Sequence, residues 1–266
     1  MRLFKKIPTN FKTIFFEVIG ILFLLLIWEI IALCVNNSFI FPHLDGIFAA
    51  LINILEEVTT WTAIGQSLLR TIISLVISFI FAFILGLIAG LFKPVKDFLA
   101  PLVYLLKLVP TPCVVFFIIL FFLREPNIGS LIITFLIVFP ILYESFVEGL
   151  TNIDSSIKLS LRLEGYYSKK SIFKVLIPES MPYLLLGCIN SIGLGVKVSI
   201  MSEILIGTDS LWGIGRLIQI YKINAEYDKM IALTLLVIFV FIIIDLLFSY
   251  IKIFKGVYLV FFKKTK

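Results

Sequence analysis

The sequence alternates long apolar stretches with short polar ones. Six apolar stretches of about 20 residues contain few charged side chains, and about 20 residues is the length with which an α-helix crosses the hydrocarbon core of a membrane. We therefore predict an all-α integral membrane protein with about six spans, at residues 16–35, 68–92, 99–123, 129–149, 181–201 and 230–251. The spans leave no room for an independent soluble domain, so residues 1–266 are expected to form one transmembrane domain.

The composition agrees with this pattern and adds an orientation. Apolar residues make up 61% of the chain and charged residues 15%, which excludes an ordinary soluble protein. If the N-terminus is cytoplasmic, 16 of the 23 Lys and Arg residues fall in cytoplasmic segments and only 4 in external ones. The positive-inside rule then places both termini in the cytoplasm, and the net charge of +6 indicates membrane orientation rather than a nucleic-acid partner.

One external connection is predicted to have structure of its own. Residues 36–67 contain no Lys or Arg, which agrees with an external position. Ile47, Leu51 and Ile54 are spaced as on one face of a helix, so we expect a short helix along the outer surface.

The cytoplasmic loop at residues 151–179 is predicted to form two short amphipathic helices. Asn152 or Asp154 can cap a first helix in which Ile157 and Leu161 share a face, and Gly165 then ends it. Ser168 can cap the second helix, and Pro178, which has no backbone N–H, is expected to end it. We expect no core of the chain's own to cover the apolar faces, so a partner protein is the predicted recipient; the alternative is that they lie on lipid headgroups.

Several polar residues lie within the predicted spans, where charge is costly and usually functional. Lys107 precedes Pro110 and Pro112, which are expected to break the third span and free backbone carbonyls beside a transport path; a simple packing kink is the alternative. Glu144 belongs either to a polar path or to a solvated helix end. Arg70 is expected to extend its charge to the membrane surface from the end of the second span.

The outer end of the fifth span carries a second set of candidates. Lys197 and Glu203 could pair with each other or frame a gate, and Lys197 is the leading candidate for contact with an anionic solute. Gly213 and Gly215 follow, where unusual backbone angles would suit a re-entrant gate; an ordinary surface loop is the alternative.

Chemistry of other kinds is not expected from the remaining candidates. The single histidine, His43, is assigned no role, and the three cysteines are predicted to be small buried hydrophobes. No catalytic or metal-binding set is recognisable, so the chain is not expected to be an enzyme.

The cytoplasmic loop resembles the EAA loop of ABC-transporter permeases. That pattern continues from its glycine through nine residues to Ile-x-Leu-Pro, which here corresponds to Gly165, Val175, Ile177 and Pro178. The Glu-Ala-Ala positions hold Leu159, Ser160 and Leu161 instead, so the name-giving triplet is missing.

Further short motifs extend the resemblance along the chain to the nitrate/sulfonate/taurine-type permeases. In order, they are Trp28–Glu29, Phe41–Pro42, Val109–Pro112, Phe139–Ile141, Gly149–Leu150, Ser202–Glu203 and Gly213–Gly215.

The resemblance implies the permease of a type I ABC importer in the bacterial plasma membrane. It implies two permease copies, expected to be a homodimer, two cytoplasmic ATPase subunits and an external substrate-binding protein. ATP and Mg²⁺ would bind only to the ATPase; the chain has no Gly-Lys dipeptide and hence no phosphate-binding Walker loop. The coupling residues are then expected to be Ile157, Leu159, Ser160, Leu161, Gly165, Ile172, Phe173, Val175, Ile177 and Pro178.

The sequence is compatible with several transported solutes. The resemblance suggests a small anion such as a sulfonate, nitrate or taurine, and the same permease type also serves thiamine-pyrimidine precursors and other small metabolites. A secondary transporter or channel without an ATPase is the alternative class, but no inverted repeat is visible in the sequence to favour it.

Overall fold

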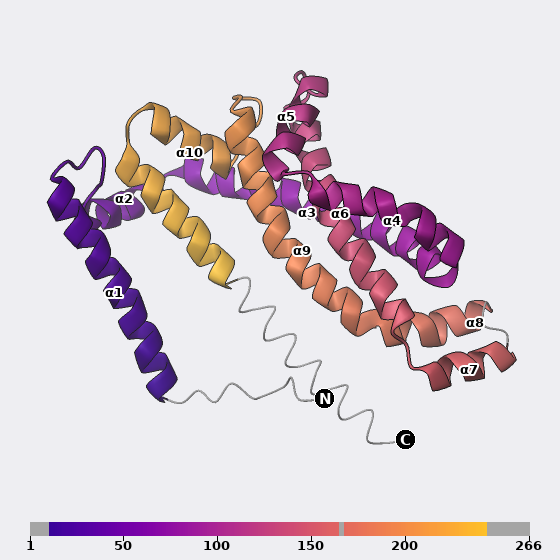
Figure 1. Ribbon diagram of the computed structural model, residues 1–266. Coiled ribbons are helices and arrows are strands. Elements are labelled where there is room, and N and C mark those ends of the chain that lie inside the picture. Colours follow the sequence, from indigo (N-terminus) through magenta and orange to yellow (C-terminus); the bar gives the residue numbers. More distant parts are fainter. Residues whose placement is uncertain (1–10, 165–167, 244–266) are drawn as a thin grey trace. The chain divides into compact units, whose positions relative to one another are not determined.

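The long helix α3 (Val58–Leu91) organises the larger part of the molecule in the computed structural model, which describes residues 11–164 and 168–243 (Figure 1). Apart from Arg70, one face of α3 carries small or short side chains, spaced three or four residues apart from Thr60 to Ala89. This face packs against α6 (Pro126–Thr151) and α9 (Ile177–Ile206). Small residues let helix backbones approach closely: a Cβ added at Gly86 would lie 2.9 Å from the Phe146 ring.

The described residues fall into two compact units. The N-terminal unit contains α1 (Phe11–Val35), α2 (Leu44–Glu56) and residues 220–236. The core unit contains α3, α4 (Lys93–Leu108), α5 (Thr111–Phe121), α6, α7 (Ser155–Glu164), α8 (Lys169–Ser171), α9 and the chain up to residue 219; residues 237–243 also belong to it. Helix α10 (Ile214–Ile223) and a further helix over residues 227–243 continue from one unit into the other.

Four helices are long and apolar enough to cross a membrane, namely Val18–Val35 within α1, α3, α6 and the helix Ile172–Ile206. The pair α4 and α5 adds a fifth candidate, although the two helices meet at an angle of 99°. The predicted all-α membrane fold is thus confirmed for the described residues. The sixth predicted span, 230–251, is helical as far as residue 243, and its last residues lie outside the described part.

Two of the helix boundaries differ from the sequence-based expectation. Helix α3 begins at Val58 rather than near residue 68, because its small-residue face already starts at Thr60. At about 1.5 Å per residue its 34 residues span about 51 Å, well beyond a hydrocarbon core of about 30 Å. The predicted surface helix is present as α2, with Ile47 and Ile54 buried.

The faces that point away from the packed helices are apolar. On α3, for example, Leu69, Val76 and Ile80 are all exposed, as suits contact with lipid. Cys34 and Cys113 are exposed in the same way, so the prediction that all three cysteines are buried was wrong. Lipid is as apolar as a protein interior, and the sequence therefore does not distinguish the two positions.

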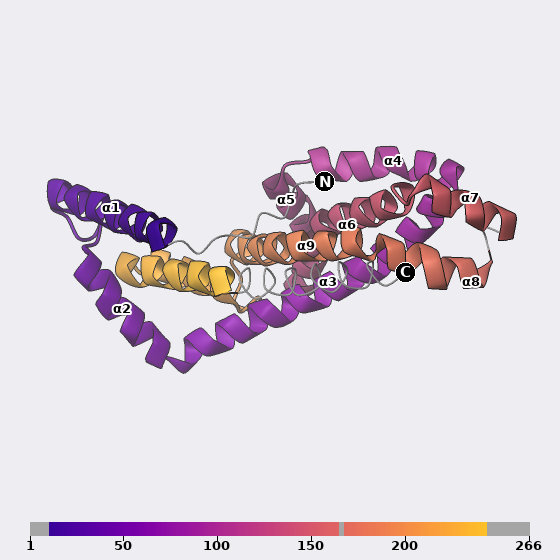
Figure 2. The ribbon, with the colours of Figure 1, turned by 90° about the horizontal axis from the view of Figure 1, so that it is seen from below.

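Pro178 does not end the second loop helix, contrary to the prediction. The helix continues from α8 through a π-helical turn at Ile172–Leu176 into α9 (Figure 2). In that turn the Ile177 N–H donates to the Ile172 carbonyl, five residues back. The wider turn displaces the backbone ahead of the proline ring, so the helix passes Pro178 without a break.

Candidate functional site

A buried ion pair lies where α9 approaches its end at Ile206. Arg70 of α3 and Glu203 of α9 form a salt bridge, with 6% and 0% of their side chains exposed. Ser67 donates to both carboxylate oxygens of Glu203 at 2.8 Å, and the Gly215 N–H donates to Oε2 at 2.8 Å. Arg70 also donates to Asn127 Oδ1 at 2.9 Å and to the Trp212 carbonyl at 3.1 Å. We call Ser67, Arg70, Asn127, Glu203, Trp212 and Gly215 the Glu203 cluster.

The segment that follows α9 fits this cluster closely. Gly207 adopts a left-handed conformation (φ 63°) and caps α9, which turns the chain back toward the bundle. A Cβ at Gly213 would lie 2.7 Å from Glu203 Oε1, and one at Gly215 would lie 2.6 Å from Glu203 Cβ. Both glycines are therefore required for close approach; neither has the unusual backbone angles that we expected.

Two expectations for this end of the helices were wrong. Arg70 does not extend toward the membrane surface, because the Glu203 carboxylate and two further acceptors hold it inside. Lys197 does not pair with Glu203; its side chain is exposed, and within residues 11–164 and 168–243 it has no carboxylate partner. Sequence reasoning missed Ser67 and Asn127 and misplaced Arg70, although the three- and four-residue spacing of Ser67, Arg70 and Ser74 already placed Arg70 on the packed face of α3.

A second ion pair joins two residues that the sequence suggested separately. Lys107 Nζ on α4 lies 2.6 Å from Glu144 Oε2 on α6, and the two side chains are 45% and 43% exposed. The break predicted at Pro110 and Pro112 is present: α4 ends at Leu108 and α5 begins at Thr111, with Pro112 in its first turn. Pro140 remains inside α6 without ending it.

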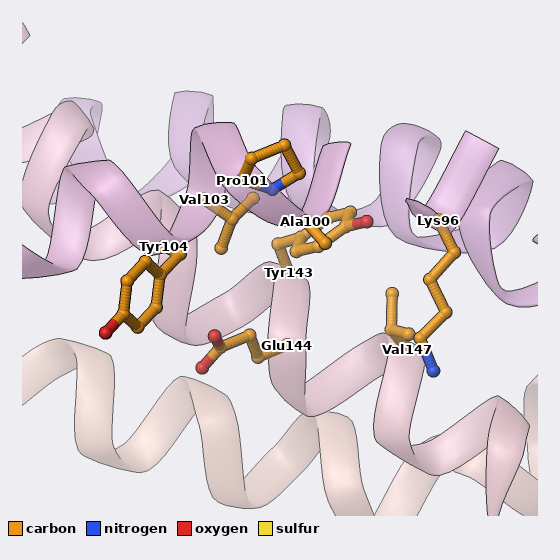
Figure 3. Close-up of a pocket in the computed structure, with 8 residues that line it drawn as sticks. All are labelled: Lys96, Ala100, Pro101, Val103, Tyr104, Tyr143, Glu144 and Val147. Carbon is orange, nitrogen blue, oxygen red and sulfur yellow. The ribbon is translucent and has the colours of Figure 1, made fainter. Parts of the chain in front are cut away.

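A cavity of about 460 Å³ lies beside this second pair, between α4 and α6 (Figure 3). Both helices contribute side chains to its lining. The lining residues are Lys96, Ala100, Pro101, Val103 and Tyr104 of α4, and Tyr143, Glu144 and Val147 of α6.

One face of α9 carries polar groups that the core unit leaves open. Asn190 and Lys197 are exposed and lie seven residues apart, which places them on the same face of the helix. A Cβ added at Gly193, between them, would meet no atom within 4 Å. An apolar helix with an Asn and a Lys on one open face is suited to line a water-filled path.

The two loop helices lie together at the other end of the core unit (Figures 1 and 2). Asp154 is the residue that caps α7, with its side chain accepting from the Ser156 N–H at 3.0 Å, and Ser168 accepts from the Ser171 N–H at 3.0 Å. Leu161 is buried in a hydrophobic cluster that also contains Phe146 and Leu150 of α6 and Leu184 of α9. The expectation that these helices lack a core of their own was therefore wrong.

The predicted coupling residues divide into two groups. Those that pack into the chain's own core are Ile157, Leu161, Ile172, Val175 and Ile177. Leu159 and Phe173 are 63% and 64% exposed, and Ser160 and Pro178 are exposed as well. Gly165 lies outside the described residues.

In the N-terminal unit, two of the short sequence motifs meet each other. The Trp28 ring lies 4.3 Å from the Phe41 ring, and its Nε1–H donates to the Pro42 carbonyl at 3.1 Å. His43, to which we assigned no role, pairs with Glu29 at 2.8 Å.

Outside the predicted spans, a hydrogen bond with Glu226 raises the pKa of Lys229.

Comparison with known proteins identifies the family. Residues 82–252 match the model of a family described as binding-protein-dependent transport system inner membrane component. The chain belongs to this family. No curated protein matches the chain. The matched residues include α4 to α10, and hence Glu203, the pair of Lys107 and Glu144, the cavity and the loop helices, whereas Arg70 precedes the matched range.

Membership establishes the general role of the molecule. It is a multi-pass membrane component of a binding-protein-dependent ABC transporter and not an enzyme. The family operates with a separate ATPase and a substrate-binding protein. The permease thus supplies the path across the membrane, and its partners supply the energy and the solute.

Proposed function

We propose that two copies of this permease form the path of an importer for a small anionic solute of the nitrate, sulfonate or taurine kind. An external binding protein delivers the solute, and two cytoplasmic ATPase subunits dock at the α7–α8 loop. The second copy provides the other wall of the path, facing the open polar face of α9.

The charge on the open face of α9 is the observation that supports an anion. Glu203 is neutralised by Arg70, and Glu144 is neutralised by Lys107. Lys197 is exposed on a spanning helix and has no carboxylate partner within residues 11–164 and 168–243. A lysine facing lipid at the centre of a span costs about 2.5–3.5 kcal/mol, whereas one facing a water-filled path attracts an anion.

The loop helices support the proposed coupling to an ATPase. Their inner faces are anchored to α6 and α9, so the loop is rigidly connected to two spanning helices. Leu159 and Phe173 remain exposed on its surface, where a protein partner can cover them. Movement of a docked ATPase would then be transmitted directly to α6 and α9.

Uptake by the Lys197→Met variant tests the path. In cells that express the permease with its ATPase and binding protein, we expect the concentration of labelled taurine, ethanesulfonate or nitrate that half-saturates uptake to rise about tenfold, because one charge–anion contact is lost. Lys222→Met, at the exposed end of α10, is the control and should leave uptake unchanged. An unaltered uptake curve in the Lys197→Met variant would remove Lys197 from the path.

The loop is tested separately by Phe173→Glu. We expect the variant to lose most of the ATP hydrolysis that is stimulated by solute and binding protein, because a charge replaces an apolar contact at the docking surface. Phe173→Leu, which keeps that surface apolar, should retain most of it. Normal stimulated hydrolysis and uptake in Phe173→Glu would contradict the docking role.

A further inference from the structure

We infer that the cavity between α4 and α6 binds an organic anion with a hydrocarbon body, and that the permease therefore carries an organic rather than an inorganic anion. This inference rests on the proposed transport of an anion, and it restricts the solute to organic anions. The anionic head would lie near Lys96 and Tyr143, and the body would lie against the apolar wall.

The cavity is large enough for a small organic molecule, and half of its lining residues are apolar. A volume of about 460 Å³ falls in the range of sites for small organic molecules, about 300–1,000 Å³, and is far larger than a nitrate or sulfate ion requires. Four of its eight lining residues are apolar or nearly so: Ala100, Pro101, Val103 and Val147. Such a wall gives no favourable contact to a fully hydrated inorganic ion, but it stabilises an alkyl or aryl group.

The lining of the cavity contains one lysine that no carboxylate neutralises among the described residues. Glu144 is already paired with Lys107, which lies eleven residues after Lys96 on the same face of α4. Lys96 is half-buried and has no carboxylate partner within the described part of the chain. It lies at one side of the cavity and Glu144 at the other (Figure 3). The uncompensated charge of the lining is therefore positive.

Tyr143 lines the cavity and has a buried hydroxyl group. It is 3% exposed, and its hydroxyl has no hydrogen-bond partner among the described residues. The serines and threonines on these helices can donate to a carbonyl one turn back, as Thr134 on α6 does to Ser130, but a phenol is too long to do so. The Tyr143 hydroxyl lies under α4, on the Lys96 side of Ala100 (Figure 3). An anionic oxygen bound beside Lys96 would supply the missing partner, which a buried hydroxyl requires.

The inference is tested by direct binding to the purified permease in phosphatidylcholine nanodiscs. The probes are sulfate and the straight-chain alkanesulfonates from ethanesulfonate to hexanesulfonate, measured by ligand-observed NMR. We expect no binding of sulfate, and we expect affinity to rise by up to about fourfold per methylene until the cavity is full. Equal binding of sulfate and butanesulfonate would overturn the inference.

Three variants locate the site. Lys96→Gln should weaken butanesulfonate binding about tenfold, and the isosteric Tyr143→Phe should weaken it several-fold. Lys93→Gln, on the same helix but outside the cavity lining, should bind as the parent does. Unchanged binding in both Lys96→Gln and Tyr143→Phe would place the anion elsewhere and overturn the inference.

A lipid headgroup is the other source of an organic anion. Nanodiscs with phosphatidylglycerol should leave butanesulfonate binding unchanged; competition by this lipid would identify a headgroup site and overturn the inference. If Lys197→Met impairs uptake while the cavity variants bind normally, this inference alone fails. If the permease and its partners take up no anion at all, the proposed function fails.

Discussion

The two ion pairs between spanning helices differ in almost every physical respect. The pair of Arg70 and Glu203 is buried, with 6% and 0% exposure, whereas Lys107 and Glu144 are 45% and 43% exposed. The buried carboxylate also accepts hydrogen bonds from Ser67 and from the Gly215 N–H. The exposed pair is held by a single contact of 2.6 Å beside a cavity.

This difference shows that charge within a membrane span has two separate uses. The Glu203 cluster satisfies its donors and acceptors internally, so it fixes α3, α6, α9 and the start of α10 against one another. The Lys107–Glu144 pair retains open positions around both groups, so either charge can respond to a solute in the cavity. The number of charged residues in a span does not distinguish these two roles. The burial of the charged side chains and their hydrogen-bond partners do.

The largest expected effect is the loss of one member of the buried pair. Glu203→Leu should lower the free energy of unfolding by about 3–5 kcal/mol, because it leaves the Arg70 charge buried and unpaired. Denaturation in mixed detergent micelles measures this change. Glu144→Leu is the matched variant at the exposed pair and should cost less than about 1 kcal/mol.

The double variant Arg70→Met/Glu203→Leu sharpens the same contrast. It removes both charges and should recover much of the stability that Glu203→Leu loses, since no unpaired charge remains. If Glu203→Leu and Glu144→Leu were equally stable, the distinction between the two pairs would be wrong.

A smaller loss of stability is expected at the backbone that closes the buried cluster. Gly215→Ala should cost about 1–3 kcal/mol, because the added methyl group would lie 2.6 Å from Glu203 Cβ and against the backbone of α9. Gly65→Ala is the control, since its Cβ would meet nothing within 4 Å, and it should be neutral or slightly stabilising. Equal effects of the two substitutions on the free energy of unfolding would show that α10 is not packed against Glu203.

The smallest effect on stability is expected at Lys107. Lys107→Met should change the free energy of unfolding by less than about 1 kcal/mol, because the pair is half-exposed. Uptake should nevertheless fall several-fold, since the variant leaves Glu144 as an unpaired negative charge beside the proposed anion site. A stable variant with full uptake would show that this pair has no role in transport.

Local features of the fold were predictable where the cause lies within a few residues. The proline pair at Pro110 and Pro112 ends α4 because proline cannot continue the hydrogen-bond ladder. Asp154 and Ser168 cap the loop helices because their side chains accept from backbone N–H groups nearby. The same local reasoning failed at Pro178, where a π-helical turn lets the helix continue.

The sequence by itself determined that this protein lies in a membrane, where its helices run, and which loop carries two amphipathic helices. These properties follow from local hydropathy and backbone chemistry. The tertiary structure decided the partner of each charge: Arg70 and Glu203 are 133 residues apart, and Lys107 and Glu144 are 37 apart. Hydropathy reports only that a charge is costly in a span, whereas the packing of the helices determines whether that charge is neutralised, buried or left open to a solute.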